Sequence, residues 1–169
     1  FIHPWFRNGV DTSVVHNLVI KQVNIPSFYP LRNGLHYIGN LVVKNFELYK
    51  SINTNEAGAV TGTAYINPIE PLDSAYVDNN ETGNFIRLES GTNYMLSADL
   101  GYIRLRDMVM NEILGCSFVL EDRNTGEIVL EVGTPADSAG TNLSLMMLKP
   151  RNSHPNHPSW PLMFKNVYY

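Results

Sequence analysis

The sequence predicts an all-β protein, a two-sheet antiparallel sandwich of jelly-roll type with about eight or nine strands. Short runs that alternate or are rich in β-branched residues recur along the chain, and Gly, Pro, Asn and Asp turn signals separate them. Neither alternating helices nor a repeat of solenoid length is apparent. The Cys-Trp-Cys signature of immunoglobulin domains is also missing, which favours the jelly roll.

The first half of the chain is expected to hold an arm and four strands. Residues 1–12 are aromatic and interrupted by Pro4, which predicts an extended N-terminal arm, and residues 13–169 are expected to be a single domain. The apolar phase slips near Asn45, which indicates either a bulge or a strand buried on both faces. We expect strands over residues 13–23, 35–50, 59–66 and 85–89, with a polar loop over residues 73–84.

In the second half, residues 92–104 alternate regularly and predict one continuous strand. The segment from Leu105 to Leu114 stays open between a short helix capped by Asp107 and another strand. Further strands are expected over residues 142–149 and 162–169, separated by an irregular Pro-rich segment over residues 150–161.

Residues 115–133 carry the strongest hairpin signal, because two alternating runs flank an Asp/Asn/Gly turn. A period of two predicts one buried face, which carries Phe118, Leu120, Ile128, Leu130 and Val132. The opposite face carries three glutamates and should be solvated. Cys116 lies in the first of these strands, so we expect a buried, inert thiol.

Composition excludes several classes of function. The net charge of −4 and the charged fraction of 17% provide no basic surface for nucleic acid. A single cysteine excludes an internal disulfide, and no apolar run reaches the ~18 residues that a membrane helix needs, so membrane insertion is not expected. No motif for a nucleophile or a nucleotide cofactor stands out, and His154 and His157 lie in a Pro-rich segment without further zinc ligands. We therefore expect a protein that is not an enzyme.

One polar segment matches most of a calcium-loop pattern. The candidate oxygen ligands are Asp78, Asn80, Thr82 and Glu89, with Gly83 at the turn. The flanking sequence is not helical, as an EF-hand would require, so a fortuitous polar loop is the alternative. Calcium is thus the one possible cofactor.

The run from Leu88 to Asp99 resembles the strand entry of jelly-roll carbohydrate-binding modules, and residues 162–168 are similar to their closing strand. This resemblance implies a glycan ligand and a structural calcium at the Asp78 loop.

Two functions fit these observations. The first is a structural subunit of a virion or an extracellular filament, a homo-oligomer or larger assembly in which the arm contacts neighbouring subunits through Phe1, Ile2, Trp5 and Phe6. The alternative is a carbohydrate-binding module of jelly-roll type. In either case the candidate contacts to a glycan or partner are Trp160, Tyr168 and Tyr169.

Overall fold

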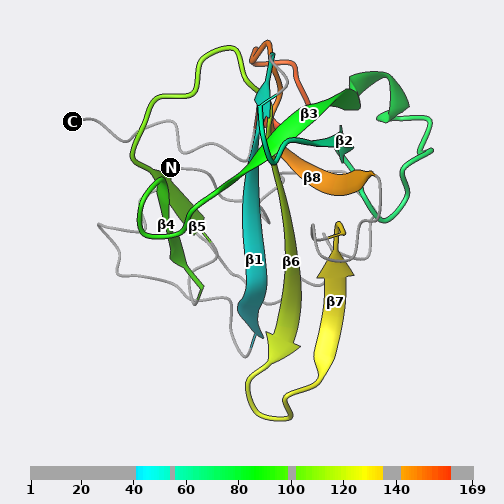
Figure 1. Ribbon diagram of the computed structural model, residues 1–169. Helices are drawn as coiled ribbons and strands as arrows, with labels where there is room; N and C mark the ends of the chain where they lie inside the picture. Colours follow the sequence, from blue (N-terminus) through cyan, green and yellow to red (C-terminus); the bar gives the residue numbers. More distant parts are fainter. Residues whose placement is uncertain (1–40, 54–55, 99–101, 135–141, 161–169) are drawn as a thin grey trace.

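The computed structural model describes residues 41–53, 56–98, 102–134 and 142–160, and within them it is built from strands (Figure 1). The strands are β1 (Leu41–Ile52), β2 (Val60–Tyr65), β3 (Glu81–Leu88), β4 (Tyr94–Ser97), β5 (Tyr102–Leu105), β6 (Leu114–Asp122), β7 (Ile128–Val132) and β8 (Leu143–Lys149). One 3-10 turn, η1 (Val77–Asn79), is the only helical element in these ranges. The predicted all-β class is therefore confirmed. No helix in these ranges is long and apolar enough to cross a membrane.

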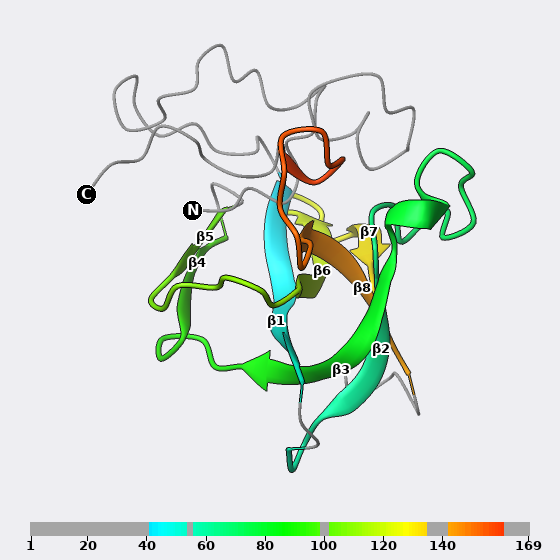
Figure 2. The same cartoon turned by 90° about the horizontal axis from the view of Figure 1, so that it is seen from above.

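The strands form a six-stranded sheet in the order β1-β3-β2-β8-β6-β7 and a two-stranded sheet of β4 and β5. Because β6 also pairs with β1, five of the six strands close a ring, and β7 extends from β6 outside it (Figure 2). The expectation that every pair is antiparallel is wrong, since β2 and β8 pair in parallel. A ring with an odd number of strands cannot alternate in direction throughout, so one parallel pair is unavoidable.

Strand β1 changes its buried face part-way along its length. Its register with β6 shifts between Lys44 and Glu47, and Asn45 adopts a φ of 48°. After the shift Leu48 packs into one core cluster and Tyr49 into the other. The slip in apolar phase thus marks both a bulge and a strand buried on two faces.

Two hydrophobic clusters hold the fold together. The first lies between the large sheet and the β4–β5 sheet and includes Tyr94, Ile103 and Phe118. The second lies among the ring strands and includes Tyr49 and Phe85. Strand β8 contributes to both clusters, because Met146 and Leu148 enter the first while Leu143, Leu145 and Met147 enter the second. Full burial of each such side chain contributes about 1.5–3 kcal/mol.

A glycine permits the close approach of the parallel pair. A Cβ on Gly62 would lie 2.6 Å from Cβ of Leu143 and 2.8 Å from its carbonyl oxygen. Gly62 is buried on β2 and pairs with Leu143 on β8. The ring can therefore close at this point only around a residue without a side chain.

The continuous strand predicted over residues 92–104 is wrong. The chain forms two short antiparallel strands instead, with Tyr94 opposite Leu105 and Ser97 opposite Tyr102. Tyr94 and Ile103 both face the first core cluster. An alternating pattern indicates an extended backbone with one apolar face. Two successive strands that face the same core give one unbroken alternating pattern, so the pattern does not show where the chain reverses direction.

Two segments differ from expectation at their boundaries. The segment from Leu105 to Leu114, predicted as a helix or a strand, is mostly neither: β5 ends at Leu105, and an irregular stretch leads to β6 at Leu114. Strand β3 begins at Glu81, inside the predicted polar loop. Its side chains Thr82 and Asn84 bond to Thr63 and Thr61 across the sheet, at 3.1 and 3.0 Å, so a polar face concealed the strand.

The predicted hairpin is confirmed as β6 and β7, with Gly126 at a φ of 72° in the turn. Leu130 and Val132 face the core as expected, but Ile128 is 59% exposed. The register shifts between Leu120 and Glu121, which leaves Val129 as a bulge and places Ile128 opposite Glu121 at the turn end of the hairpin. Ile128 therefore lies on the face opposite to Leu130. The predicted arm over residues 1–12 and the strands over residues 13–23 and 162–169 lie outside the described residues.

Candidate functional site

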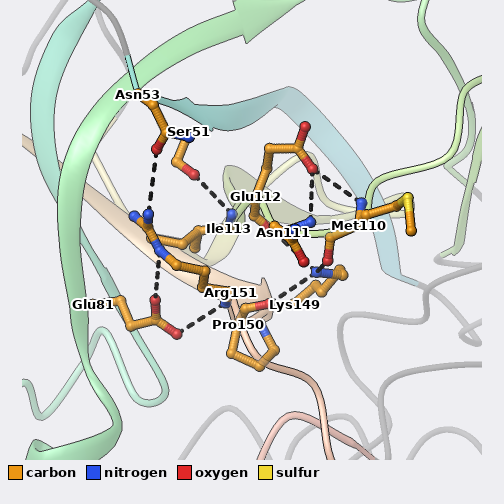
Figure 3. A network of polar contacts seen from close by, with 10 residues as sticks. All are labelled: Ser51, Asn53, Glu81, Met110, Asn111, Glu112, Ile113, Lys149, Pro150 and Arg151. Atoms are coloured by element: carbon orange, nitrogen blue, oxygen red, sulfur yellow. Dashed lines mark hydrogen bonds and ion pairs between the residues drawn. The ribbon is translucent and has the colours of Figure 1, made fainter.

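Two buried charged side chains, Glu47 and Lys149, are each surrounded by polar partners. We call these groups the Glu47 cluster (Glu47, Tyr49 and Arg87) and the Lys149 network (Lys149 and its neighbours in Figure 3). Charged groups are rarely buried unless they have partners, so such clusters are the first places to look for a site. Their hydrogen bonds decide what chemistry they can perform.

The Glu47 cluster forms where β1 lies between β3 and β6. Tyr49 is the register partner of Arg87, and Glu47 lies on the same face two residues away. Arg87 Nη2 lies 2.9 Å from Glu47 Oε1, and the Tyr49 hydroxyl donates a hydrogen bond to Glu47 Oε2. Both carboxylate oxygens therefore have a donor, which is what a carboxylate that is only 7% exposed requires.

Ser117 faces Glu47 across the β1–β6 pair and is 1% exposed. Its hydroxyl has no hydrogen-bond partner among the described residues. A serine nucleophile needs a base within hydrogen-bond reach, and the Glu47 carboxylate is directed to Arg87 and Tyr49. Cys116, the next residue, is fully buried as predicted, and desolvation raises the pKa of its thiol far above the usual range. Neither side chain is arranged for covalent chemistry.

The centre of the Lys149 network is an ammonium group at the end of β8 (Figure 3). Lys149 Nζ donates to the carbonyl oxygens of Met110 at 2.8 Å, Pro150 at 2.9 Å and Glu112 at 3.1 Å. Desolvation lowers the pKa of Lys149, and the carboxylates of Glu112 and Glu81 oppose this effect. All three donors of the ammonium are engaged, so the group fastens the irregular segment before β6 onto β8.

The rest of the Lys149 network links further segments. The Glu112 carboxylate accepts hydrogen bonds from the backbone N–H groups of Met110 and Asn111, at 3.0 and 3.1 Å. Desolvation would raise the pKa of Glu112, but these backbone donors outweigh it and the pKa is lowered. Arg151 donates its backbone N–H to Glu81 at 3.0 Å and its side chain to Asn53 at 3.3 Å (Figure 3). The network joins four segments.

The Pro-rich segment after β8 contains a second kind of polar group. His157 is 7% exposed, and its Nδ1 accepts the backbone N–H of Ser159 at 3.2 Å while lying 2.9 Å from the Ser159 hydroxyl. The His154 ring packs edge-on against it at 5.6 Å. Since these contacts join residues two or three positions apart, they define a tight turn.

The four candidate calcium ligands do not converge. Asn80 accepts the Ile66 N–H and donates to the Pro71 carbonyl, while Thr82 pairs with Thr63. Strand β3 lies between Asp78 and Glu89 and spans roughly 23 Å, whereas calcium ligands lie about 2.3–2.6 Å from the ion. These residues do not fit one calcium ion. Within the described ranges, no group of three or more His, Cys, Asp or Glu side chains could hold a metal.

The predicted contact residues are mostly outside the described ranges. Those outside are Phe1, Ile2, Trp5 and Phe6 of the arm, together with Tyr168 and Tyr169. Trp160 is described and is partly buried, with its backbone N–H donated to the His157 carbonyl at 2.9 Å. Of these predicted contacts, Trp160 alone lies within the described ranges.

Sequence reasoning missed both Glu47 and Lys149. Each is a charged residue with apolar neighbours in the sequence, as in Phe46-Glu47-Leu48 and Leu148-Lys149-Pro150. A charge within an apolar run signals a buried, partnered group, and this signal was available.

Comparison with known proteins adds nothing to this picture: no family model matches the chain, and no curated protein or solved structure matches it. The fold and the contacts above are therefore the basis for function.

Proposed function

We propose that this chain is a non-enzymatic structural subunit of a larger protein assembly, such as a virion or an extracellular filament. The buried polar groups support this proposal, because the ammonium of Lys149 and the carboxylate of Glu47 are engaged in holding strands and loops together. Since these buried charges stabilise the fold, we expect the function to depend on contacts that the protein surface makes with other chains.

The observation that carries the proposal is the edge of the large sheet at β7. Among the described residues, no strand pairs with the outer edge of β7, and Ile128 and Val129 are 59% and 37% exposed. An apolar edge strand offers unpaired backbone groups and apolar side chains to another chain. Such an edge is a favourable surface for contact with a neighbouring subunit.

The arm is the second proposed contact, through Phe1, Ile2, Trp5 and Phe6. Aromatic and aliphatic side chains on an extended segment are typical anchors between subunits. Deleting residues 1–9 should lower the sedimenting mass while leaving the β-type circular dichroism unchanged. An arm-deleted chain that sediments like the complete chain would contradict the role of the arm.

A second candidate is a carbohydrate-binding module of jelly-roll type. It is favoured by Trp160, a partly exposed aromatic residue in the Pro-rich segment after β8, because tryptophan rings can stack on sugars. A glycan array should then show binding that Trp160→Ala removes. Equal or absent binding by both proteins would count against this candidate. A calcium ion in such a module would need ligands other than the Asp78 loop.

A further inference from the structure

We infer that copies of this chain associate head to tail, with the loop between β2 and β3 of one copy docked on the outer face of the β4–β5 sheet of the next. We call this loop, residues 66–80, the Leu72 loop. The inference rests on the proposed role in assembly and adds a contact that does not use β7. A contact between two different surfaces of the same chain repeats from copy to copy, so it builds rings or filaments.

The Leu72 loop presents large apolar side chains to solvent. Leu72 is 87% exposed, and Val77 and Ile69 are 40% and 37% exposed. The loop projects from the ring at the end where β3 begins (Figure 1). Apolar side chains that gather on one projecting loop, with polar residues around them, are typical of a contact site for another protein.

Two asparagine side chains stabilise the backbone of this loop. Asn80 Oδ1 accepts the Ile66 N–H at 3.1 Å, where the loop leaves β2. Asn67 Oδ1 accepts the N–H groups of Ile69 and Glu70, at 3.3 and 3.4 Å. Docking of a loop that is already ordered costs less conformational entropy than docking of a loop that must first be ordered.

The charge of the Leu72 loop limits the surfaces on which it can dock. Its charged residues are Glu70, Asp73 and Asp78, and it contains no Lys, Arg or His. Like charges that meet across an interface are unfavourable. Carboxylates beside exposed apolar side chains therefore favour a partner surface that combines apolar and basic groups.

The outer face of the β4–β5 sheet has this composition. Tyr94 faces the first core cluster, so its neighbour Met95 and the register partner Arg104 point away from that cluster. Met95 is 53% exposed, and Arg104 and Arg106 are exposed as well. Arg106 lies next along the sheet, because its N–H bonds to the Asn93 carbonyl at 2.9 Å. Strands β4 and β5 contain no Asp or Glu, so this face can receive the apolar and acidic groups of the Leu72 loop.

The Leu72 loop and the β4–β5 sheet lie on opposite sides of the described structure, both in Figure 1 and in the perpendicular view of Figure 2. The loop of one chain therefore cannot contact the β4–β5 sheet of the same chain. A second copy supplies the complementary surface, and its own loop then remains available for a further copy.

Two substitutions in the full-length chain, one on each surface, test the contact by sedimentation equilibrium. Leu72→Lys places an ammonium group against the arginines, and Arg106→Glu places a carboxylate against the acidic loop. Each variant alone should have a mean mass lower than that of the wild type by about twofold or more. An equimolar mixture should regain mass, up to about twofold above either variant, because the intact loop of one docks on the intact sheet of the other. Met110→Lys is the matched control, since Met110 is 67% exposed in the segment before β6, and it should leave the mass unchanged.

Each outcome decides the inference. It is overturned if the complete chain sediments as a monomer, if either variant keeps the wild-type mass, or if the mixture is no heavier than its components. Circular dichroism identifies a variant that fails to fold, and Ile69→Lys or Met95→Glu then replaces it on the same surface. The other contacts are judged separately: if deletion of residues 1–9 or a charge on β7 splits the assembly but Leu72→Lys and Arg106→Glu do not, this contact fails and the proposed function stands.

Discussion

At the scale of single residues, Lys149 shows how a charge can be buried in this fold without serving chemistry. Its ammonium group has three donors, and three carbonyl oxygens from Met110, Glu112 and Pro150 accept them. Desolvation lowers its pKa, because burial disfavours the charged ammonium. The three carbonyl oxygens compensate for this cost, because they replace the water molecules that would otherwise solvate the charge. The contacts also tie the segment before β6 to the end of β8.

We predict that Lys149→Met destabilises the protein by about 1–3 kcal/mol, because methionine fills a similar volume but leaves these carbonyls without their donor. Denaturant unfolding measures the loss. Lys44→Met is the control, because Lys44 is exposed and its Nζ makes a single ion pair, at 4.0 Å from Glu121 Oε1. This substitution should change the free energy of unfolding by less than about 1 kcal/mol. Equal effects of the two substitutions would contradict the structural role of Lys149.

Glu112 predicts a dependence of stability on pH. Desolvation would raise its pKa, but backbone donors stabilise the carboxylate more strongly, so the pKa in the folded protein lies below the ordinary value of 4.5. The resulting stabilisation is fully present above the unfolded pKa and is lost as the pH falls through the folded pKa. The difference in unfolding free energy between wild type and Glu112→Gln should therefore be largest near neutral pH and shrink below about pH 4.5. A difference that stays constant across this pH range would contradict the prediction.

At the scale of elements, the parallel β2–β8 pair depends on a glycine. Gly62 and Gly83 are register partners on β2 and β3, yet only Gly62 meets a backbone neighbour at close range. A Cβ on Gly83 would meet its nearest atom at 3.9 Å, which is an ordinary contact. The same substitution, glycine to alanine, can therefore be compared at two positions that differ in the room available for a Cβ atom.

Gly62→Ala should destabilise the protein by about 1–3 kcal/mol or more, because its Cβ would force β2 and β8 apart. Gly83→Ala should change the free energy of unfolding by less than about 1 kcal/mol, because alanine at this position also reduces the conformational entropy of the unfolded chain. Thermal and denaturant unfolding of both variants check this prediction. A larger loss at Gly83 would show that the ring does not close as described.

Much of the element pattern could be predicted from the sequence because apolar periodicity reports burial directly. It predicts β1 with its bulge, the β6–β7 hairpin and β8. It fails at β3, whose polar Thr82 and Asn84 hide the strand, and at residues 92–104, where two strands facing one core continue a single alternation. The candidate calcium loop fails as a cluster because the motif assumes a tight loop, whereas the chain runs extended along β3.

At the scale of the whole molecule, closure of the ring leaves one strand outside it. Each of the five ring strands pairs with a neighbour on both sides. Strand β6 is long enough to pair with β8 near Leu114 and with β7 near Leu120. The presence of two sheets could be predicted from the number of short strands. The parallel pairing of β2 with β8, which closes the ring, could not, because no local sequence pattern indicates which distant strands pair. The remaining edge of β7 is the basis for our account of assembly.

A charge introduced on the β7 edge tests that account most directly. Val129→Lys places an ammonium group on this edge, where Val129 is 37% exposed, and lysine on an edge strand opposes contact with another chain. Met110→Lys is the matched control, since Met110 is 67% exposed in the segment before β6. In sedimentation equilibrium the first variant should have a lower mean mass than the wild type, and the second should not. An unchanged mass for Val129→Lys, or an equal loss in both variants, would contradict assembly through the β7 edge.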